Sequence, residues 1–329
     1  MADAERGNQS HVTEFILRGF HIPYPFRMGP FVLVLLTYLT TVLGNTLIIV
    51  AVLVDRGLHT PMYFFLGNLS CLEIWYTSNL VPRMLQGLLA EKGVVISFGG
   101  CIAQLYIFGS QAATEILLLT VMAYDRYLAI CHPLRYTALM NGRVCVELAS
   151  CSWLGGFLFN PIIMAWIYRL RFCGPNEIDH FFCDFLPLVT LSCSDTRLIT
   201  LAAFLLSSTA TLIPFLLTLT SYALILAAIV KNPSRAGRRK AFSTCTAHLT
   251  VVSTFYGALA IVYMVPTAST AVNLNKVFSL LYSLVTPLLN PLIYALRNKD
   301  VNEALRTMAA GLAQEEEILS EKYREVNDF

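Results

Sequence analysis

This 329-residue chain has few charged residues, and that shortage limits the classes of protein to which it can belong. Only 13% of its residues are Asp, Glu, Lys or Arg, whereas 56% are apolar and the mean hydropathy is +0.62. So little polar surface does not suit a soluble globule of this length, and we expect an integral membrane protein. The net charge of +2 is also too small to indicate a nucleic-acid partner.

Other features are missing as well. The start, MADAERGNQS, is polar and lacks the basic start followed by an apolar core that marks a cleaved signal peptide, so we expect the first apolar span to act as the targeting signal. No Gly/Ser linker or internal repeat marks a second domain. The six histidines follow no metal-binding or triad-like pattern, which argues against an intramembrane hydrolase. Inverted repeats and paired broken helices are not evident, which argues against a transporter. We therefore expect neither enzyme activity nor a bound metal centre.

Long apolar runs are abundant instead. Seven of them could cross a bilayer as helices, which takes about 20 residues each. They cover residues 29–54, 61–87, 98–131, 142–166, 197–230, 239–264 and 273–296. The expected fold is an all-α membrane protein, a seven-helix bundle spanning residues 29–296. A tail precedes it at 1–28, and a short amphipathic helix with an acidic tail follows at 297–329. The tail beyond residue 310 could form a short amphipathic helix or be disordered, and we favour disorder.

The basic residues indicate the orientation of the bundle. The short loop at 231–240 carries five of them, which favours a cytoplasmic C-terminus. With seven spans, the N-terminus then lies outside. Asn8 begins an N-x-S glycosylation triplet, which agrees with an outer N-terminal tail, although such triplets also arise by chance.

The nine cysteines divide into two groups. Cys101 lies at the expected outer end of the third span, and Cys173, Cys183 and Cys193 share the long loop before the fifth. Oxidising conditions on that side allow two disulfides among these four. The other five fall in spans or on the inner side, where we expect small apolar fillers.

Five strings mark the ends of the spans. They are PMYFFLGNLS at 61–70, MAYDRYLAICHPLRY at 122–136, SY at 221–222, KAFSTCTAHL at 240–249 and PLLNPLIYALRN at 287–298. Together with Gly44-Asn45, Trp153 and Pro214, they resemble the rhodopsin-like G-protein-coupled receptors, and among these the vertebrate olfactory receptors. The resemblance implies a multi-pass receptor of the plasma membrane, in sensory cilia if it serves olfaction. It also implies a small odorant ligand and a stimulatory heterotrimeric G protein that raises cyclic AMP. A receptor of the same family that binds a metabolite outside olfactory tissue remains the alternative.

The DRY triplet, Asp125, Arg126 and Tyr127, is the expected switch at the cytoplasmic face. The planar, permanently charged guanidinium of Arg126 can pair with Asp125 in one helix packing and point elsewhere in another. A permanent clasp that only orients the helix is the alternative. By resemblance, the switch also includes Tyr222, Tyr256, Asn290, Pro291 and Tyr294.

Glu73 and Glu115 interrupt apolar stretches, where a charged carboxylate is costly. Each should therefore be protonated, paired or facing a hydrated cavity. The resemblance places them near Asn45 and Asn290 in the middle of the bundle. Such a group could hold a sodium ion or share a proton, or it could be a neutral polar cluster that fixes helix packing. Apart from that ion, we expect no cofactor.

The resemblance places the ligand site in the outer half of the bundle. The candidate contacts are Phe108, Gly109, Ala112, Ala113, Asn160, Leu206, Ser207, Ala210, Leu259, Tyr263 and Ser283. Most are small or apolar, so an uncharged, largely apolar odorant fits best. Tyr263 is the best candidate for a hydrogen bond to the ligand, and Tyr256 is better placed to sense repacking. For each residue taken singly, ordinary helix packing remains the alternative.

Overall fold

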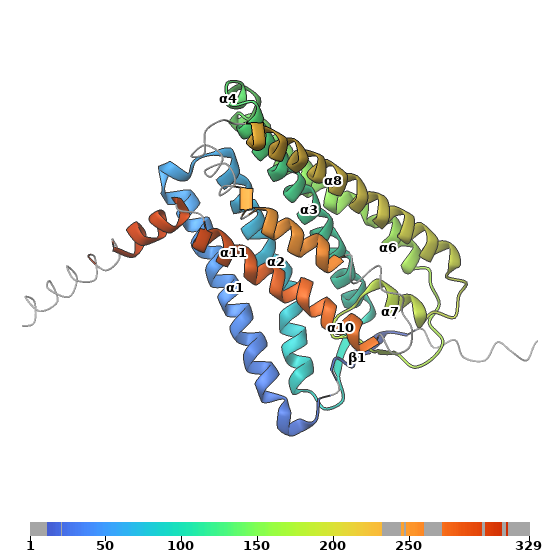
Figure 1. The fold of residues 1–329 in the computed structure, drawn as a ribbon. Helices are drawn as coiled ribbons and strands as arrows, with labels where there is room; N and C mark the ends of the chain where they lie inside the picture. The colour runs from blue at the N-terminus through green and yellow to red at the C-terminus, as the bar shows by residue number, and fades with distance from the viewer. Residues whose placement is uncertain are drawn as a thin grey trace, which may run out of the picture.

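A computed structural model describes residues 12–20, 22–231, 245–246, 248–259, 272–297, 300–310 and 314. This part of the chain is mostly helical, and the long helices run side by side as a bundle (Figure 1). The principal helices are α1 (Met28–Val54), α2 (Pro61–Leu89), α3 (Phe98–Cys131), α5 (Gly142–Phe159), α6 (Pro161–Ile167), α8 (Arg197–Lys231), α10 (Val272–Leu280) and α11 (Thr286–Arg297). A π-helical turn, η3 (Leu281–Val285), joins the last two.

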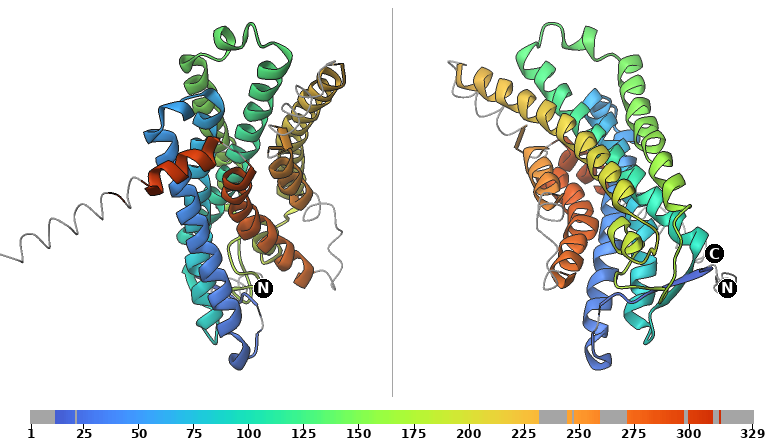
Figure 2. Two further views of the ribbon diagram at one scale, coloured as in Figure 1. Left: turned by 60° about the vertical axis from the view of Figure 1, so that its left-hand side comes forward. Right: turned by 90° about the vertical axis from the view of Figure 1, so that its right-hand side faces the viewer.

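Short elements connect these helices. They are η1 (Tyr24–Phe26), η2 (Arg56–Leu58), α4 (Tyr136–Leu139) and α7 (Phe185–Thr190). Residues 248–259 are helical, and so are residues 300–310, where the sequence predicts a short helix after the last span. Figure 2 shows that α8 and the segment from α10 to α11 lie at different sides of the bundle.

Five helical stretches in the described part of the chain are long and apolar enough to cross a membrane. They are Tyr24–Val54, Phe98–Cys131, Gly142–Ile167, Arg197–Lys231 and Lys276–Ile293. The second predicted span is the 29-residue helix α2, which is less apolar and has many buried residues, Glu73 among them. Much of the sixth lies outside the described residues. The seven-span count therefore stays a prediction.

Local signals explain several helix ends. The Ser97 hydroxyl accepts a hydrogen bond from the Gly100 amide at 3.1 Å, and so caps α3. The Asn141 side chain does the same for the Val144 amide at the start of α5. The predicted span 142–166 is broken into α5 and α6 at Pro161, because proline cannot donate the helical hydrogen bond.

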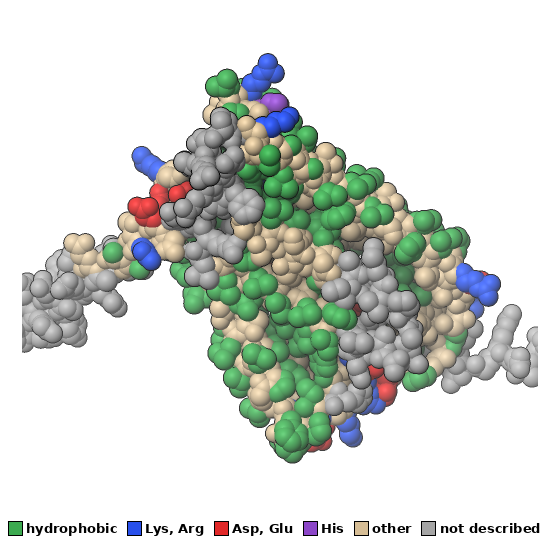
Figure 3. Space-filling model, in the orientation of Figure 1, with side chains coloured by type: hydrophobic (Ala, Val, Ile, Leu, Met, Phe, Trp, Pro, Cys, Tyr) green, Lys and Arg blue, Asp and Glu red, His purple; other side chains and the backbone are tan. Residues whose placement is uncertain are grey.

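The sides of the bundle are apolar. On α1, Leu33, Leu36 and Leu43 are exposed, and on α8 Leu212 and Leu216 are exposed. Figure 3 shows such side chains over much of the visible surface, with Lys and Arg mainly toward the ends. Exposed apolar surface of this extent is what a lipid-embedded bundle needs.

One end of the bundle carries a small sheet that the all-α prediction missed. Strand β1 (Glu14–Leu17) pairs antiparallel with β2 (Val94–Ser97) and parallel with β3 (Glu177–Ile178). The segment predicted as an N-terminal tail is thus partly ordered. These strands are two to four residues long, too short for a periodicity signal.

Both disulfides allowed by the outer cysteines are present. Cys101 at the start of α3 bonds to Cys183 in the loop before α8, and Cys173 bonds to Cys193 within that loop. Among the free cysteines, Cys145 and Cys245 are buried, as expected for apolar fillers. Cys71 and Cys151 are exposed on the described bundle, so they do not fill its core.

Candidate functional site

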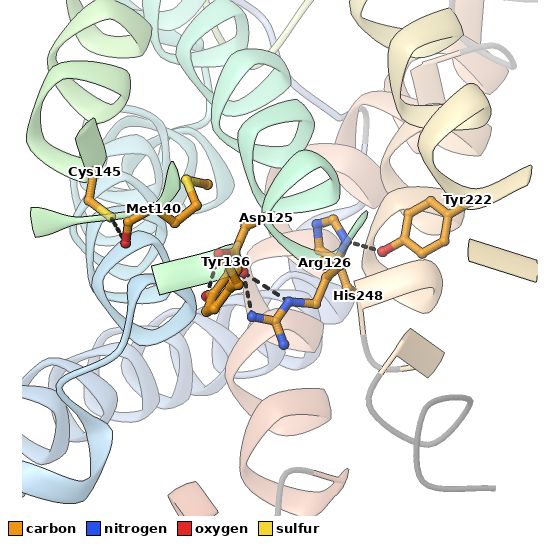
Figure 4. Close-up of polar contacts among 7 residues, drawn as sticks. All are labelled: Asp125, Arg126, Tyr136, Met140, Cys145, Tyr222 and His248. Carbon is orange, nitrogen blue, oxygen red and sulfur yellow. Dashed lines mark hydrogen bonds and ion pairs between the residues drawn. The ribbon is translucent and has the colours of Figure 1, made fainter. Parts of the chain in front are cut away.

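The side chains of Asp125 and Arg126, the first two residues of the DRY triplet, lie close together near the end of α3 (Figure 4). Arg126 donates from Nε to Asp125 Oδ2 at 3.0 Å, and its Nη2 contacts the same oxygen. The Tyr136 hydroxyl donates to the other carboxylate oxygen, Oδ1, at 2.7 Å. Asp125 is fully buried, so two donors compensate the cost of burying its charge. This arrangement is the paired form of the predicted switch.

Tyr136 belongs to the Asp125 network, although the sequence alone did not single it out. It opens α4, the short helix after Pro133, and its ring is half-buried. Burial, and then the neighbouring Asp125, raise the pKa of Tyr136. The hydroxyl therefore keeps its proton and donates a hydrogen bond to the carboxylate. The available signal was its place as the last residue of MAYDRYLAICHPLRY. That signal is weak, because aromatic residues in such loops often only anchor the chain at the membrane interface.

A second polar pair joins α8 to the helix at 248–259. The hydroxyl of Tyr222 forms a hydrogen bond with His248 Nδ1, and the two ring centroids are 5.8 Å apart. His248 is only 1% exposed, so its side chain does not lie on the surface of the described bundle. The pair instead ties two helices together near the Asp125–Arg126 clasp (Figure 4).

The remaining switch candidates are spread along the bundle. Tyr127 contacts His132 Nε2 through its hydroxyl at 3.0 Å, and the buried Tyr256 packs against Phe215 at 4.9 Å between centroids. Pro291 lies against α1 at Gly44, where an added Cβ would lie 3.0 Å from the proline ring. Tyr294 is helical, but its side chain lies outside the described residues.

Two of the four candidate ion-site residues are in contact in the interior, and a third lies near them. Asn290 donates from Nδ2 to Glu73 Oε1, and Glu115 lies within electrostatic range of Glu73. The other Glu73 oxygen and one Glu115 oxygen are buried without a hydrogen-bond partner among the described residues. Asn45 bonds instead to the Thr41 carbonyl of its own helix at 3.0 Å. Within the described chain, no group of three or more His, Cys, Asp or Glu residues could hold a metal ion.

Helix α3, the junction of α5 and α6, and η3 bring part of the predicted ligand site together. Gly109 faces Asn160, since a Cβ at Gly109 would lie 3.4 Å from the amide oxygen. Asn160 also donates to the Ser110 hydroxyl at 3.3 Å. Phe108 is buried, with its ring centroid 5.9 Å from that of Tyr282, next to the buried Ser283.

The rest of the predicted ligand site is less concentrated. Ala112 and Ala113 are half-buried on α3, and Leu206 and Ala210 are half-buried on α8. Ser207 is exposed, with its hydroxyl bonded to the Phe204 carbonyl of its own helix at 3.2 Å. Leu259 packs against the inner core cluster that contains Tyr256, and Tyr263 lies outside the described residues.

A cleft lies near the paired switch rather than beside Phe108. It has a volume of about 510 Å³ and is bordered by residues of α1, α2 and α5. Met140 and Cys145, both near Asp125 in Figure 4, contribute to its lining. The cleft is therefore distinct from the predicted odorant site.

Comparison with known proteins gives one consistent result. The olfactory receptor family profile matches residues 34–311. Human olfactory receptor 11A1 is 51% identical over 300 residues, which are 91% of this chain and 94% of that receptor. Rat olfactory receptor 226 is 48% identical and covers 97% of this chain and 98% of its own length. Human olfactory receptor 11H4 is 51% identical over 92% of this chain and 93% of that receptor.

Proposed function

This chain belongs to the olfactory receptor family, and from that membership we propose that it detects a small, largely apolar odorant and activates a stimulatory G protein. The family consists of G-protein-coupled receptors rather than enzymes, and its members are multi-pass proteins of the plasma membrane. The observation that carries the proposal is about 50% identity to olfactory receptors along nearly the whole chain.

The proposed receptor crosses the membrane seven times with its N-terminus outside. The apolar sides of the described helices support this arrangement, as does the pair of disulfides at the end that carries the small sheet. Sensory cilia are the proposed location.

The proposed ligand site lies beside Phe108, Gly109 and Asn160 in the outer half of the bundle. Aromatic rings and small residues supply apolar contacts, and the Asn160 amide supplies a polar group that can orient an odorant. A ligand acts only by preferring one bundle arrangement over another.

The proposed response is release of the Asp125–Arg126–Tyr136 network. In the paired form, both carboxylate oxygens of Asp125 are occupied. Movement of the helix at 248–259 would break the Tyr222–His248 pair and open the cytoplasmic side to the G protein.

The proposal extends to a sodium ion beside Glu73, Glu115 and Asn290. Buried carboxylate and amide oxygens without partners support an oxygen-binding cation there. The test is activation at matched ionic strength with sodium replaced by N-methylglucamine. Insensitivity to sodium, together with intact signalling in Glu73→Gln, would leave only the neutral polar cluster.

A cyclic AMP screen tests the main proposal. Cells expressing the full chain are exposed to a broad odorant panel, with Arg126→Ala as the inactive control and surface receptor measured in parallel. A response in the wild type that is absent in Arg126→Ala supports the proposal. A wild type that reaches the surface, ignores every odorant and answers only polar metabolites contradicts the odorant assignment in favour of a metabolite receptor.

A further inference from the structure

A buried cation links the outer loop to the last span. Lys276 on α10 is only 1% exposed, although lysine is rarely buried unless its charge is paired. Its Nζ donates to Asp179 Oδ1 at 2.5 Å and to the Gly19 carbonyl at 2.9 Å. Asp179 is half exposed, so this carboxylate is the partner that water can reach.

The contact joins three distant segments of the chain. The Gly19 amide donates to the His180 carbonyl at 3.1 Å, so the segment after β1 is already fastened to the loop that contains Asp179. Lys276 then connects both segments to α10, five residues before the π-helical turn that starts at Leu281. Single π-helical turns are frequent at functional sites.

The same loop continues directly to the predicted ligand site. Phe182 is fully buried, and its ring centroid lies 4.9 Å from that of Phe108. The next residue, Cys183, is bonded to Cys101, and its amide donates to Gln104 Oε1 at 3.0 Å. The loop is thus attached to α3 on one side of Phe182 and to α10, through Asp179, on the other.

From this arrangement we infer that Lys276 is a positioning residue for ligand binding, whose ion pair with Asp179 holds Phe182 against Phe108. The inference rests on the proposed function, in which the odorant binds beside Phe108. With the pair intact, the loop closes the ligand site from one side. Without it, residues 179–182 separate from α10 and the odorant dissociates faster.

Three variants and a matched control test the inference. Lys276→Met keeps the length of the side chain without its charge, Asp179→Asn removes the charge of the accessible partner, and the double variant combines them. The control, Glu177→Gln, removes the charge of the Arg18–Glu177 pair, which joins the N-terminal segment to the same loop without touching α10 and whose two side chains are each more than one-third exposed. An exposed pair of that kind contributes little.

The readouts are the half-maximal concentration of an odorant that activates the wild type, the maximal response per surface receptor, and hydrogen exchange of residues 177–183 in the purified receptor. For Lys276→Met and for Asp179→Asn we expect a half-maximal concentration raised about tenfold, as for a lost charged hydrogen bond. The maximal response is retained and exchange of the loop is faster. The double variant is no worse than Lys276→Met, because the two residues act as a unit. Glu177→Gln stays near the wild type.

Either of two results would overturn the inference. One is that the Lys276→Met receptor reaches the cell surface and responds with an unchanged half-maximal odorant concentration. The other is a fall in maximal response alone, which indicates a general structural role. If no odorant activates the wild type, the proposed function fails. Hydrogen exchange of residues 177–183 then decides separately whether Lys276 holds the loop. Equal exchange in Lys276→Met and in the wild type would show that Lys276 does not hold it.

Discussion

At the level of single residues, Asp125 accepts hydrogen bonds from two side chains of different kinds. Arg126 comes from the same helix, and Tyr136 comes from the loop beyond it. A buried carboxylate held in this way stabilises the arrangement that contains both donors. The loop after α3 therefore belongs to the proposed switch along with Asp125 and Arg126.

Replacement of Tyr136 by Phe should weaken the paired form. It removes one hydrogen bond to a charged group, which typically contributes ~1.5–3 kcal/mol and so shifts a two-state equilibrium about tenfold or more. We expect higher cyclic AMP without odorant, normalised to surface receptor. Tyr124→Phe is the control, because Tyr124 is an exposed tyrosine on α3, next to Asp125 in the sequence. Basal signalling equal to the wild type would show that Tyr136 is only an anchor.

A second residue-level prediction is that His180 makes the stability of the receptor fall at acidic pH. Burial, and then the charge of Lys276, lower the pKa of His180 to about 3. The unfolded histidine titrates near ~6.5. Above that pH neither state binds the proton. Between about 6.5 and 3 only the unfolded state binds it, so the free energy of unfolding falls as the pH falls, by up to ~1.4 kcal/mol per pH unit.

His180→Gln should reduce this acid sensitivity, because glutamine keeps an acceptor for the Phe182 amide but does not titrate. The measurement is the melting temperature of the purified receptor at pH 7.5 and pH 5.5. The exposed His59 supplies the control substitution, His59→Gln. A drop in melting temperature that is the same in His180→Gln and wild type would contradict the assignment.

At the level of elements, the close approach of α3 and α5 depends on a glycine. A Cβ at Gly156 would lie 2.0 Å from the Thr114 hydroxyl oxygen and 2.6 Å from the Ser110 carbonyl oxygen. The neighbouring Gly155 meets only the end of the Leu117 side chain, at 3.0 Å, which can rotate away. The two glycines, adjacent in sequence, therefore differ in what they tolerate.

We expect Gly156→Ala to lower stability by roughly 1–3 kcal/mol or more, since the clash is with backbone and cannot be relieved by a rotamer change. Gly155→Ala should cost much less. Surface expression and the melting temperature of the purified receptor measure both. Equal behaviour of the two variants would mean that α3 and α5 are farther apart than described.

Helix positions were largely predictable, and their interruptions less so. Apolar runs place α1, α3 and α8 within a residue or two of their observed ends, because burial in lipid requires length and hydropathy. The break at Pro161 and the short strands depend on local hydrogen bonds that do not alter the average hydropathy of a window.

For the molecule as a whole, orientation is the decisive prediction. We expect the receptor expressed in mammalian cells to carry an N-linked glycan at Asn8, seen as a mobility shift on glycosidase treatment that Asn8→Gln abolishes. An acceptor triplet placed in the basic loop at 231–240 should stay unmodified, because the excess of basic residues predicts that this loop faces the cytoplasm. Modification of the inner triplet with none at Asn8 would reverse the topology and remove the basis for the outer ligand site.

Membrane class, receptor family and the DRY clasp follow from composition and short strings, because lipid demands apolar length and an ion pair between adjacent residues is local. Contacts across large sequence separations do not follow in this way. The Lys276 bridge to Asp179 and Gly19, the Tyr136 bond to Asp125 and the Tyr222–His248 pair exist only once the helices and the outer loop have packed. Neither hydropathy nor spacing encodes which distant side chains meet, because many packings bury the same apolar surface and differ only in their polar contacts.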